Sequence, residues 1–304
     1  MTTVSRWHYL VPLLAMVAYA WAAILIRYAE EADPFVIAFY RMAVASVVWA
    51  PFYWSGKRST RKVKPTKRQW SLIVLAGVML CLHFATWISS IRYTTVSSAV
   101  FLILTQPMMV AVAAHFILHE KLNRFHILSF LLTIIGAAFI FGGDLALNRE
   151  YLFGDFLAFI GAAAAGAYLF IARLVRSDRE EEPGVPLQKY LPPVFAISAL
   201  GLLVLCLVSG QPLGPFQRET WIALLLLGLV PTVIGHSLLN WSTRYLSALA
   251  VNISLVGEPI GASLLAYLLF TELPSIGLLV GSPLLILAVI LVYLRPPVVR
   301  QLPR

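Results

Sequence analysis

Glu258 is a charged residue inside a segment made otherwise of apolar and small side chains, SLVGEPIGASLLAY at residues 254–267. It stands directly before Pro259, and Gln106 stands before Pro107 in a second apolar segment. A charged group at the centre of a bilayer costs roughly 2.5–3.5 kcal/mol on insertion scales, so it usually faces a cavity or a partner. We therefore predict that Glu258 and Gln106 line a cavity and bind a hydrated small molecule or a proton there.

The two prolines are predicted hinges of the helices that carry these polar residues. Proline lacks an N–H and removes an intrahelical hydrogen bond, which is expected to free a carbonyl oxygen one turn earlier, at Ile103 and Leu255. Such irregular backbone is tolerated within a membrane where it lines a water-filled cavity. Pro107 and Pro259 would then open the helices at the place where a ligand meets the neighbouring polar side chains.

Arg41 supports a purely structural alternative to this interpretation. It lies about two turns into its own apolar segment, and we expect either a structural ion pair or a role in an outer gate. If Glu258 pairs with Arg41, or stays protonated, it serves only to hold helices together. The residues alone leave both interpretations of Glu258 open.

Three aromatic or titratable side chains are further candidates for contact with a ligand. His83 and Trp87 are four residues apart, so they share one face of a helix and could form a wall of the cavity. Tyr168 follows GAAAAG, residues 161–166, whose small side chains leave space for it to project into. Together with Trp21, these rings suit an aromatic or cationic ligand through stacking and cation–π contacts. An ordinary packing role is an equal alternative for each of them.

A metal site and a catalytic site are both poorly supported by the sequence. His115 and His119 are four residues apart and adjoin Glu120, which resembles a helical pair of metal ligands, but the wider zinc-protease pattern is absent. This group is also the one candidate for a membrane-embedded enzyme that acts on lipids. We expect no metal, no cofactor and no catalytic residue, and any ATP-driven pump would need another chain because no G-x-x-x-x-G-K-[ST] loop is present.

The composition places the chain in a membrane. Of its 304 residues 60% are hydrophobic and 12% are charged, against roughly a quarter charged in an ordinary soluble domain. So much apolar surface cannot be covered by so few polar residues, and the lipid bilayer is the expected partner. The net charge of +9 does not predict nucleic-acid binding, because the basic residues cluster between the apolar segments.

The apolar segments predict an all-α integral membrane protein with ten transmembrane helices. A bilayer-crossing helix needs about 20 mostly apolar residues, and ten segments qualify: 8–27, 34–54, 70–90, 96–118, 125–142, 154–175, 190–209, 220–240, 248–270 and 274–294. With a cytoplasmic N-terminus, 18 basic residues lie on the cytoplasmic side and four on the other. Basic residues are enriched in cytoplasmic loops, so we expect both termini in the cytoplasm and a bacterial inner membrane as the location.

The chain is predicted to contain two related halves, residues 1–152 and 153–304. When residues 91–122 are aligned with 243–274, five identical pairs occur without a gap, each separated by 152 positions. Gln106 and Glu258 are one of the aligned positions. Five helices per half is an odd number, so the second half enters the membrane from the opposite side. Inverted repeats of this kind around a central cavity are a recurring plan of transporters.

These features resemble the drug/metabolite transporter superfamily, and within it the EamA-type proteins with ten helices. The motifs that carry the resemblance are FYRMAVASVVWAP at 39–51, the endings of the fourth and ninth segments in HEKL and TELP, and GDFLAFIGAAAAGAYLFIARLVR at 154–176. The resemblance implies a central cavity lined by segments 1, 3, 4, 6, 8 and 9, with segments 5 and 10 at the periphery. In layout the chain is most similar to amino-acid exporters of the YddG and threonine/homoserine type.

The resemblance implies a secondary transporter, which exports amino acids or similar small metabolites by alternating access. Carriers of drugs, cations or other metabolites with the same fold are the main alternative, and a lipid-modifying enzyme or a scaffold without transport activity are others. We expect a monomer with a small-molecule substrate. The sequence leaves the direction of transport and proton coupling open.

Overall fold

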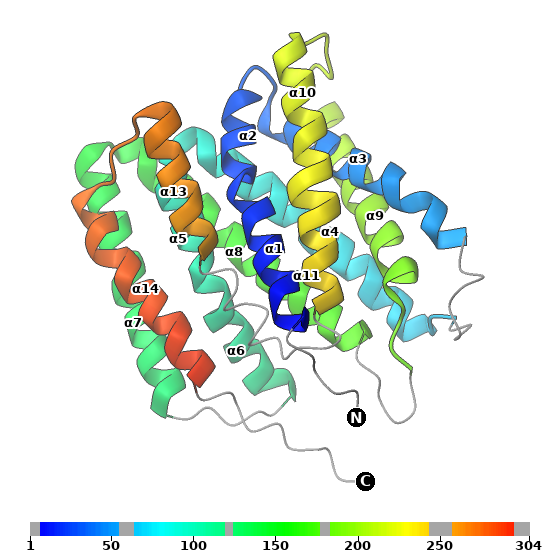
Figure 1. Cartoon of the computed structure of the whole chain (residues 1–304), viewed down its shortest axis with the longest axis horizontal. Coiled ribbons are helices and arrows are strands. Elements are labelled where there is room, and N and C mark those ends of the chain that lie inside the picture. The colour runs from blue at the N-terminus through cyan, green and yellow to red at the C-terminus, as the bar shows by residue number, and fades with distance from the viewer. Residues whose placement is uncertain (1–6, 55–63, 119–123, 177–182, 243–256, 295–304) are drawn as a thin grey trace.

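The computed structural model describes residues 7–54, 64–118, 124–176, 183–242 and 257–294, and these contain helices and no strand. The helices lie side by side in one bundle (Figure 1). In chain order they are α1 (Trp7–Ala20), α2 (Ala22–Tyr28), α3 (Pro34–Trp54), α4 (Lys67–Tyr93), α5 (Val96–Leu102), η2 (Ile103–Thr105), α6 (Gln106–Leu118), α7 (Arg124–Leu147), α8 (Arg149–Arg176), α9 (Leu187–Val208), α10 (Arg218–Leu227), η3 (Gly228–His236), α11 (Ser237–Ser242), α13 (Gly257–Phe270) and α14 (Ile276–Leu294).

Six stretches of the described chain are long and apolar enough to cross a membrane, which supports the predicted class of protein. They are Pro34–Tyr53, Lys67–Tyr93, Val96–Ile117, Arg149–Arg176, Leu187–Val208 and Arg218–Ser242. Four shorter apolar helices are Leu14–Tyr28, Ile127–Gly143, Glu258–Phe270 and Ile276–Ala288. Each of these overlaps one segment predicted from the sequence, and several extend a few residues beyond the predicted bounds, but the count of ten spans stays a prediction.

The outer surface of the bundle is apolar, as a surface in contact with lipid must be. Large hydrophobic side chains such as Val47, Phe116 and Val208 are well exposed. Polar caps lie at the helix ends, where the chain leaves the apolar region. Thr66 forms a capping box with Gln69 at the start of α4, and thus satisfies backbone N–H groups that have no partner within the helix.

Close helix packing in the bundle depends on glycine. Gly154 and Gly161 of α8 face α4, and a Cβ atom added at Gly154 would lie 2.6 Å from the backbone nitrogen of Thr94. A Cβ atom added at Gly161 would lie 3.0 Å from the Cβ atom of Trp87. Small residues at such contacts allow helix backbones to approach closely within a membrane. The α4–α8 contact therefore holds one wall of the interior in a fixed place.

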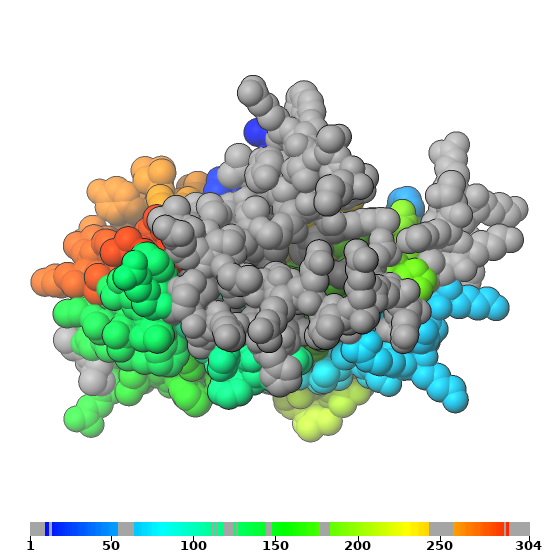
Figure 2. Space-filling model, turned by 90° about the horizontal axis from the view of Figure 1, so that it is seen from below, coloured from blue at the N-terminus to red at the C-terminus, as the bar shows by residue number. Residues whose placement is uncertain are grey.

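Helices α7 and α14 form a second glycine-mediated pair at one edge of the molecule (Figure 1). Gly136 and Gly143 of α7 meet Gly281 and Gly277 of α14, so that backbone contacts backbone. From below, this pair and α4 lie toward opposite ends of the long axis (Figure 2). The family resemblance implied that segments 5 and 10 are peripheral, and this is where α7 and α14 lie.

Two of the membrane-length stretches are interrupted near the middle of the bundle. A 3-10 turn at Ile103–Thr105 separates α5 from α6, with Pro107 as the second residue of α6. A π-helical stretch at Gly228–His236 contains Pro231 and separates α10 from α11. Irregular turns of this kind inside helices are frequent at functional sites.

The detailed prediction for the backbone at Pro107 was wrong in one respect. The carbonyl oxygen of Ile103 is not free, because it accepts a hydrogen bond from the N–H of Gln106 in the 3-10 turn. Pro259 is the third residue of α13, and Leu255 lies outside the described residues. The hinge roles of Pro107 and Pro259 stay predictions.

Candidate functional site: a polar cavity inside the bundle

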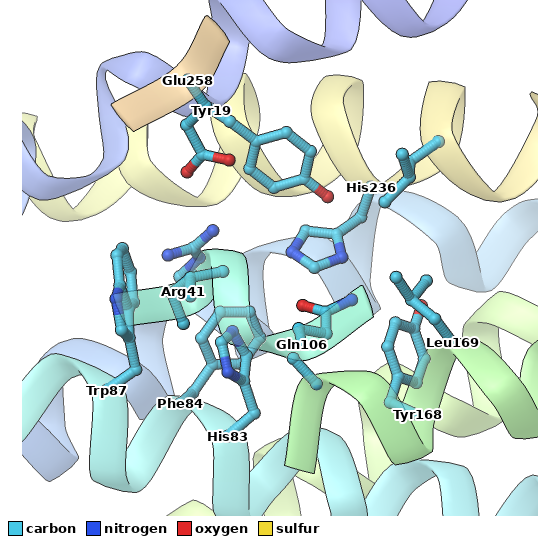
Figure 3. A pocket seen from close by; sticks show the side chains of 13 residues that line it. Tyr19, Arg41, His83, Phe84, Trp87, Gln106, Tyr168, Leu169, His236 and Glu258 are labelled. Atoms are coloured by element: carbon cyan, nitrogen blue, oxygen red, sulfur yellow. The ribbon is translucent and has the colours of Figure 1, made fainter. Parts of the chain in front are cut away.

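A cavity lies between the two interrupted helices, α1, α3, α4, α8 and α13 (Figure 3). About 60 Å³ of it is open to the centre of a water-sized sphere; one water needs roughly 10–15 Å³ by this measure. Its lining combines aromatic rings with polar and charged groups. The lining residues are Tyr19, Arg41, His83, Phe84, Trp87, Ile103, Gln106, Ala165, Tyr168, Leu169, His236, Leu239 and Glu258.

The structure brings five of the six side chains predicted to contact a ligand to this one cavity. They come from four parts of the chain far apart in sequence, and they are Gln106, Glu258, His83, Trp87 and Tyr168. Arg41 lines the same cavity. Trp21, in contrast, is 42% exposed and does not belong to the lining, so its assignment as a cavity aromatic was wrong. That the lining residues bind a substrate stays a prediction.

Arg41 is oriented by one hydrogen bond and by the rings of Phe84 and Trp87. Its Nε donates to the hydroxyl of Thr232 at 2.7 Å, and that hydroxyl donates to the carbonyl of Leu227 at 2.9 Å. The guanidinium carbon lies 4.3 Å from the centre of the Phe84 ring, a cation–π contact. Neither Arg41 nor Glu258 makes an ion pair within 4.0 Å among the described residues. The predicted ion pair of Arg41 is thus not found among the described residues, and its structural or gate role stays a prediction.

His83 is held in one tautomer by the neighbouring helix. Its Nδ1 lies 2.9 Å from the carbonyl oxygen of Gly161 in α8. A carbonyl oxygen can only accept, so Nδ1 carries the hydrogen and Nε2 of the neutral ring is a hydrogen-bond acceptor. The ring stacks on Trp87, with centroids 5.9 Å apart and an angle of 15° between the planes. The two residues thus form one flat wall of the cavity.

Tyr168 and His236 belong to a small hydrogen-bonded group at the other side of the cavity. Asn240 donates from Nδ2 to the Tyr168 hydroxyl at 2.8 Å and to the His236 carbonyl at 2.7 Å. The His236 ring packs edge-on against Tyr19, with centroids 5.0 Å apart. These contacts connect α8, α1 and the π-helical stretch around one space.

Five buried polar atoms on the cavity wall have no hydrogen-bond partner among the described residues. They are Tyr19 Oη, Arg41 Nη1, Trp87 Nε1, Gln106 Nε2 and His236 Nδ1. Buried polar groups in proteins are nearly always hydrogen-bonded to protein or to ordered water. Their gathering around one cavity indicates a space made for water or a polar ligand.

Several of these residues were not selected from the sequence. Phe84 and Tyr19 carry no signal of their own in a chain rich in aromatic residues. Thr232 follows Pro231 inside an apolar segment, and a proline in such a place predicts an irregular helix. That signal would have directed attention to this segment.

Of the histidine pair considered as a metal site, His115 alone is among the described residues, and it does not line the cavity. His115 belongs to α6, while His119 and Glu120 lie outside the described residues. Within the described ranges, no group of three or more His, Cys, Asp or Glu residues is placed to hold a metal ion.

Comparison with known proteins shows the family. A model of the EamA-like transporter family matches residues 6–142 and again residues 152–294. The chain belongs to the EamA-like transporter family. It is therefore a multi-pass integral membrane protein, related to proteins described as transporters.

Relatives and a solved structure extend over nearly the whole chain. An uncharacterized transporter of Archaeoglobus fulgidus is 27% identical over 292 residues, 92% of this chain and 95% of the relative. An uncharacterized transporter of Clostridium kluyveri is 22% identical over 86% of this chain and 84% of its own length. A crystal structure of another protein shares the fold, with a TM-score of 0.67 at 17% identity and coverage of 96% and 98% of the two chains.

Proposed function

We propose that this EamA-family protein is a secondary transporter that exports amino acids or similar small metabolites by alternating access. The observation that carries the proposal is the buried cavity with its unpartnered hydrogen-bond donors and its carboxylate. In an apolar bundle such groups are costly unless they contact water or a polar solute. A protein that only supports other chains has no need of them.

The proposed arrangement is ten membrane helices in two inverted repeats, residues 1–152 and 153–304. The repetition in the sequence and the two separate matches to the family model support it. Helix α1 begins and α14 ends at the same end of the bundle (Figure 1). This agrees with two termini on one side, which we place in the cytoplasm of a bacterial cell, with the protein in the inner membrane as a monomer.

A group of contacts at the opposite end of the bundle is the proposed outer gate. Arg27 of α2 forms an ion pair with Glu272, which follows α13, at 3.5 Å. The other carboxylate oxygen of Glu272 accepts from the Ser97 N–H of α5 at 3.2 Å. A second hollow lies beside Arg27 and Arg92, and about 300 Å³ of it is open to the centre of a water-sized sphere. Separation of α2 from α13 and α5 would join this hollow to the outside and let a solute leave.

A carrier of cationic compounds is the second candidate. Glu258 provides a negative charge, and the rings of Trp87 and Phe84 offer faces for a cation–π contact. Arg41 counts against it, because its guanidinium already occupies the face of Phe84. The first candidate therefore explains more of the cavity.

Transport by the purified chain alone tests the proposal. Proteoliposomes are loaded with labelled amino acids, nucleobases or cationic dyes, and efflux and uptake are measured against protein-free liposomes. We expect saturable efflux of at least one amino acid without ATP, and a loss in Glu258→Gln or Gln106→Ala protein that elutes as a single folded species. A chain that moves none of these compounds would contradict the proposal, and movement of the cationic dyes alone would favour the second candidate.

A further inference from the structure

We propose that Arg41 and Glu258 are the two ends of a binding site for a zwitterionic α-amino acid. Arg41 binds the carboxylate of the substrate, and Glu258 binds its ammonium group. This inference rests on the proposed transport function and narrows its substrate class. It also assigns Arg41 to substrate contact, in place of the structural ion pair or gate expected from the sequence.

Arg41 has the free groups that bind a carboxylate. The side chain is 1% exposed, and its Nε is already bonded to Thr232. Its Nη1 is buried without a partner, and the residue lines the cavity. A guanidinium whose Nε is held by the protein and whose Nη1 has no partner among the described residues can donate to a carboxylate, and its planar shape favours a bidentate pair.

The surroundings of Arg41 prevent it from turning away. Thr232 both donates to Leu227 and accepts from Arg41, so its hydroxyl has a defined orientation. Phe84 covers the guanidinium at 4.3 Å. Because Nε is bonded to Thr232 and the Phe84 ring lies against it, the guanidinium is held in one orientation at the cavity wall. Such preorganisation reduces the ordering cost when a ligand binds.

Glu258 is placed to complete the pair without neutralising Arg41. It belongs to the first turn of α13, and its carboxylate points toward the Arg41 guanidinium in Figure 3. The two side chains form no ion pair within 4.0 Å among the described residues. Opposite charges that remain apart in an apolar interior are costly. An α-amino acid carries its ammonium and carboxylate on one carbon atom, so a single molecule can bridge them.

The charges also exclude other classes of ligand. An amine would pair with Glu258 and leave Arg41 buried without a counter-charge, and a simple carboxylic acid would leave Glu258 in that state. A buried charge without a partner is strongly unfavourable. The pair therefore selects a dipolar molecule over either singly charged analogue.

The remainder of the cavity receives the substrate side chain. His236, Gln106 and Tyr168 lie on the side of the cavity away from Glu258 in Figure 3. Nδ1 of His236 and Nε2 of Gln106 are buried there without partners. The aromatic rings suit an apolar or aromatic side chain, and the free polar atoms suit one with a hydroxyl or amide.

Three matched probes test the charge requirement. In proteoliposomes with the full chain at pH 7, we compare L-phenylalanine with 2-phenylethylamine and 3-phenylpropionate, and L-leucine with 3-methylbutylamine and 4-methylpentanoate. For each compound, inhibition of the efflux of the best-transported amino acid is measured. We expect the amino acids to inhibit at concentrations roughly 10- to 100-fold lower than either analogue, the range of one charged hydrogen-bonded contact.

Substitutions then separate the two ends of the site. In Arg41→Gln, the affinity for the amino acid should fall roughly 10- to 100-fold, while that for the amine stays or improves. In Glu258→Gln, the affinity for the amino acid should fall while that for the carboxylic acid stays or improves. Arg41→Lys keeps the charge without the planar fork and should have an intermediate effect. Arg218 and Glu219 are adjacent exposed residues at the start of α10. Arg218→Gln and Glu219→Gln make the same chemical changes there and serve as matched controls.

The outcomes distinguish this inference from the transport function itself. If the amine inhibits as well as the amino acid in the wild-type chain, the zwitterion site is wrong and the chain is a carrier of cations. If Arg41→Gln or Glu258→Gln weakens all three probes equally, the charges act only on the structure and the inference is overturned. If the wild-type chain transports no compound at all, both proposals fail.

Discussion

Arginine side chains occur in the cavity and at the end of the bundle with the proposed outer gate, called the outer end below, and their contacts differ. Arg92 donates to the backbone carbonyls of Glu30 and Ala32, and Arg27 pairs with Glu272. Arg41, in contrast, donates a hydrogen bond from Nε to Thr232, and its buried Nη1 has no partner among the described residues. At the outer end the guanidinium groups bond to the chain itself, apart from the buried Nε of Arg27, whereas on the cavity wall five buried polar atoms have no partner among the described residues.

This difference leads to opposite expectations for mutations. At the outer end, loss of a polar group removes a bond that the folded chain already makes, so stability should fall. In the cavity, loss of an unpartnered group removes no protein bond, so stability should hold while transport suffers. The four predictions that follow test this contrast.

Thr232→Val should have the largest effect. It removes the hydroxyl that orients the Arg41 fork, at nearly the same side-chain shape. We expect apparent substrate affinity to fall roughly 10- to 100-fold, the range of a hydrogen bond to a charged group. The apparent affinity is measured from the dependence of efflux on substrate concentration in proteoliposomes. Thr86→Val is the control, because the Thr86 hydroxyl bonds to carbonyl groups of its own helix. An unchanged affinity would show that the orientation of Arg41 is unimportant.

Arg92→Gln should mainly reduce stability. The guanidinium holds the turn between α2 and α3 through two carbonyl groups, and each such bond contributes about 1–2 kcal/mol. We expect a lower thermal midpoint in detergent, with the apparent substrate affinity of the folded fraction unchanged. A large loss of affinity with normal stability would place Arg92 in the substrate path and remove the contrast between the two regions.

Tyr19→Phe should change transport without a cost in stability. The hydroxyl is buried and has no partner, and the ring contact with His236 remains in the variant. We expect apparent affinity to fall roughly threefold, as for one neutral hydrogen bond to water or substrate. The free energy of unfolding should stay within about 0.5 kcal/mol of wild type. A clear destabilisation would indicate that the hydroxyl has a structural role.

Glu272→Gln should have the smallest effect on stability. The Arg27–Glu272 pair is partly exposed, so its loss should cost less than about 1 kcal/mol. If the pair closes an outer gate, a cysteine introduced at Ile37, in the hollow beside it, should react faster with a membrane-impermeant thiol reagent. The Cys81→Ala, Cys206→Ala background removes the native thiols. Equal reaction rates would refute the gate.

Much of the site could be predicted because polar residues are rare in this chain. Gln106, Glu258, His83 and Tyr168 were recognised as polar groups within apolar segments, and each lines the cavity. The cost of burying such groups makes their positions informative, whatever the exact packing. The repeat added a second, independent reason for two of them.

The remaining features could not be predicted, because they depend on which face each helix turns inward. Phe84 and Trp21 look equally suitable in the sequence, yet one lies under Arg41 and the other is exposed. A helix that is apolar all round carries no periodic signal for its inner face. The π-helical stretch at Gly228–His236 also changes the side of the helix on which Thr232 lies. The helix propensities of the residues in this stretch do not predict that change.

The amino-acid sequence by itself determined that the protein lies in a lipid bilayer, that it is helical, and which few polar residues are too costly to expose to lipid. Those properties follow from summed transfer free energies, which depend on composition and segment length and not on neighbours. The tertiary structure decided that Arg41 bonds to Thr232 and not to Glu258, and that five polar atoms share one cavity. Hydrogen bonds and ion pairs between segments far apart in the chain depend on distances of a few ångströms, and only helix packing sets those distances.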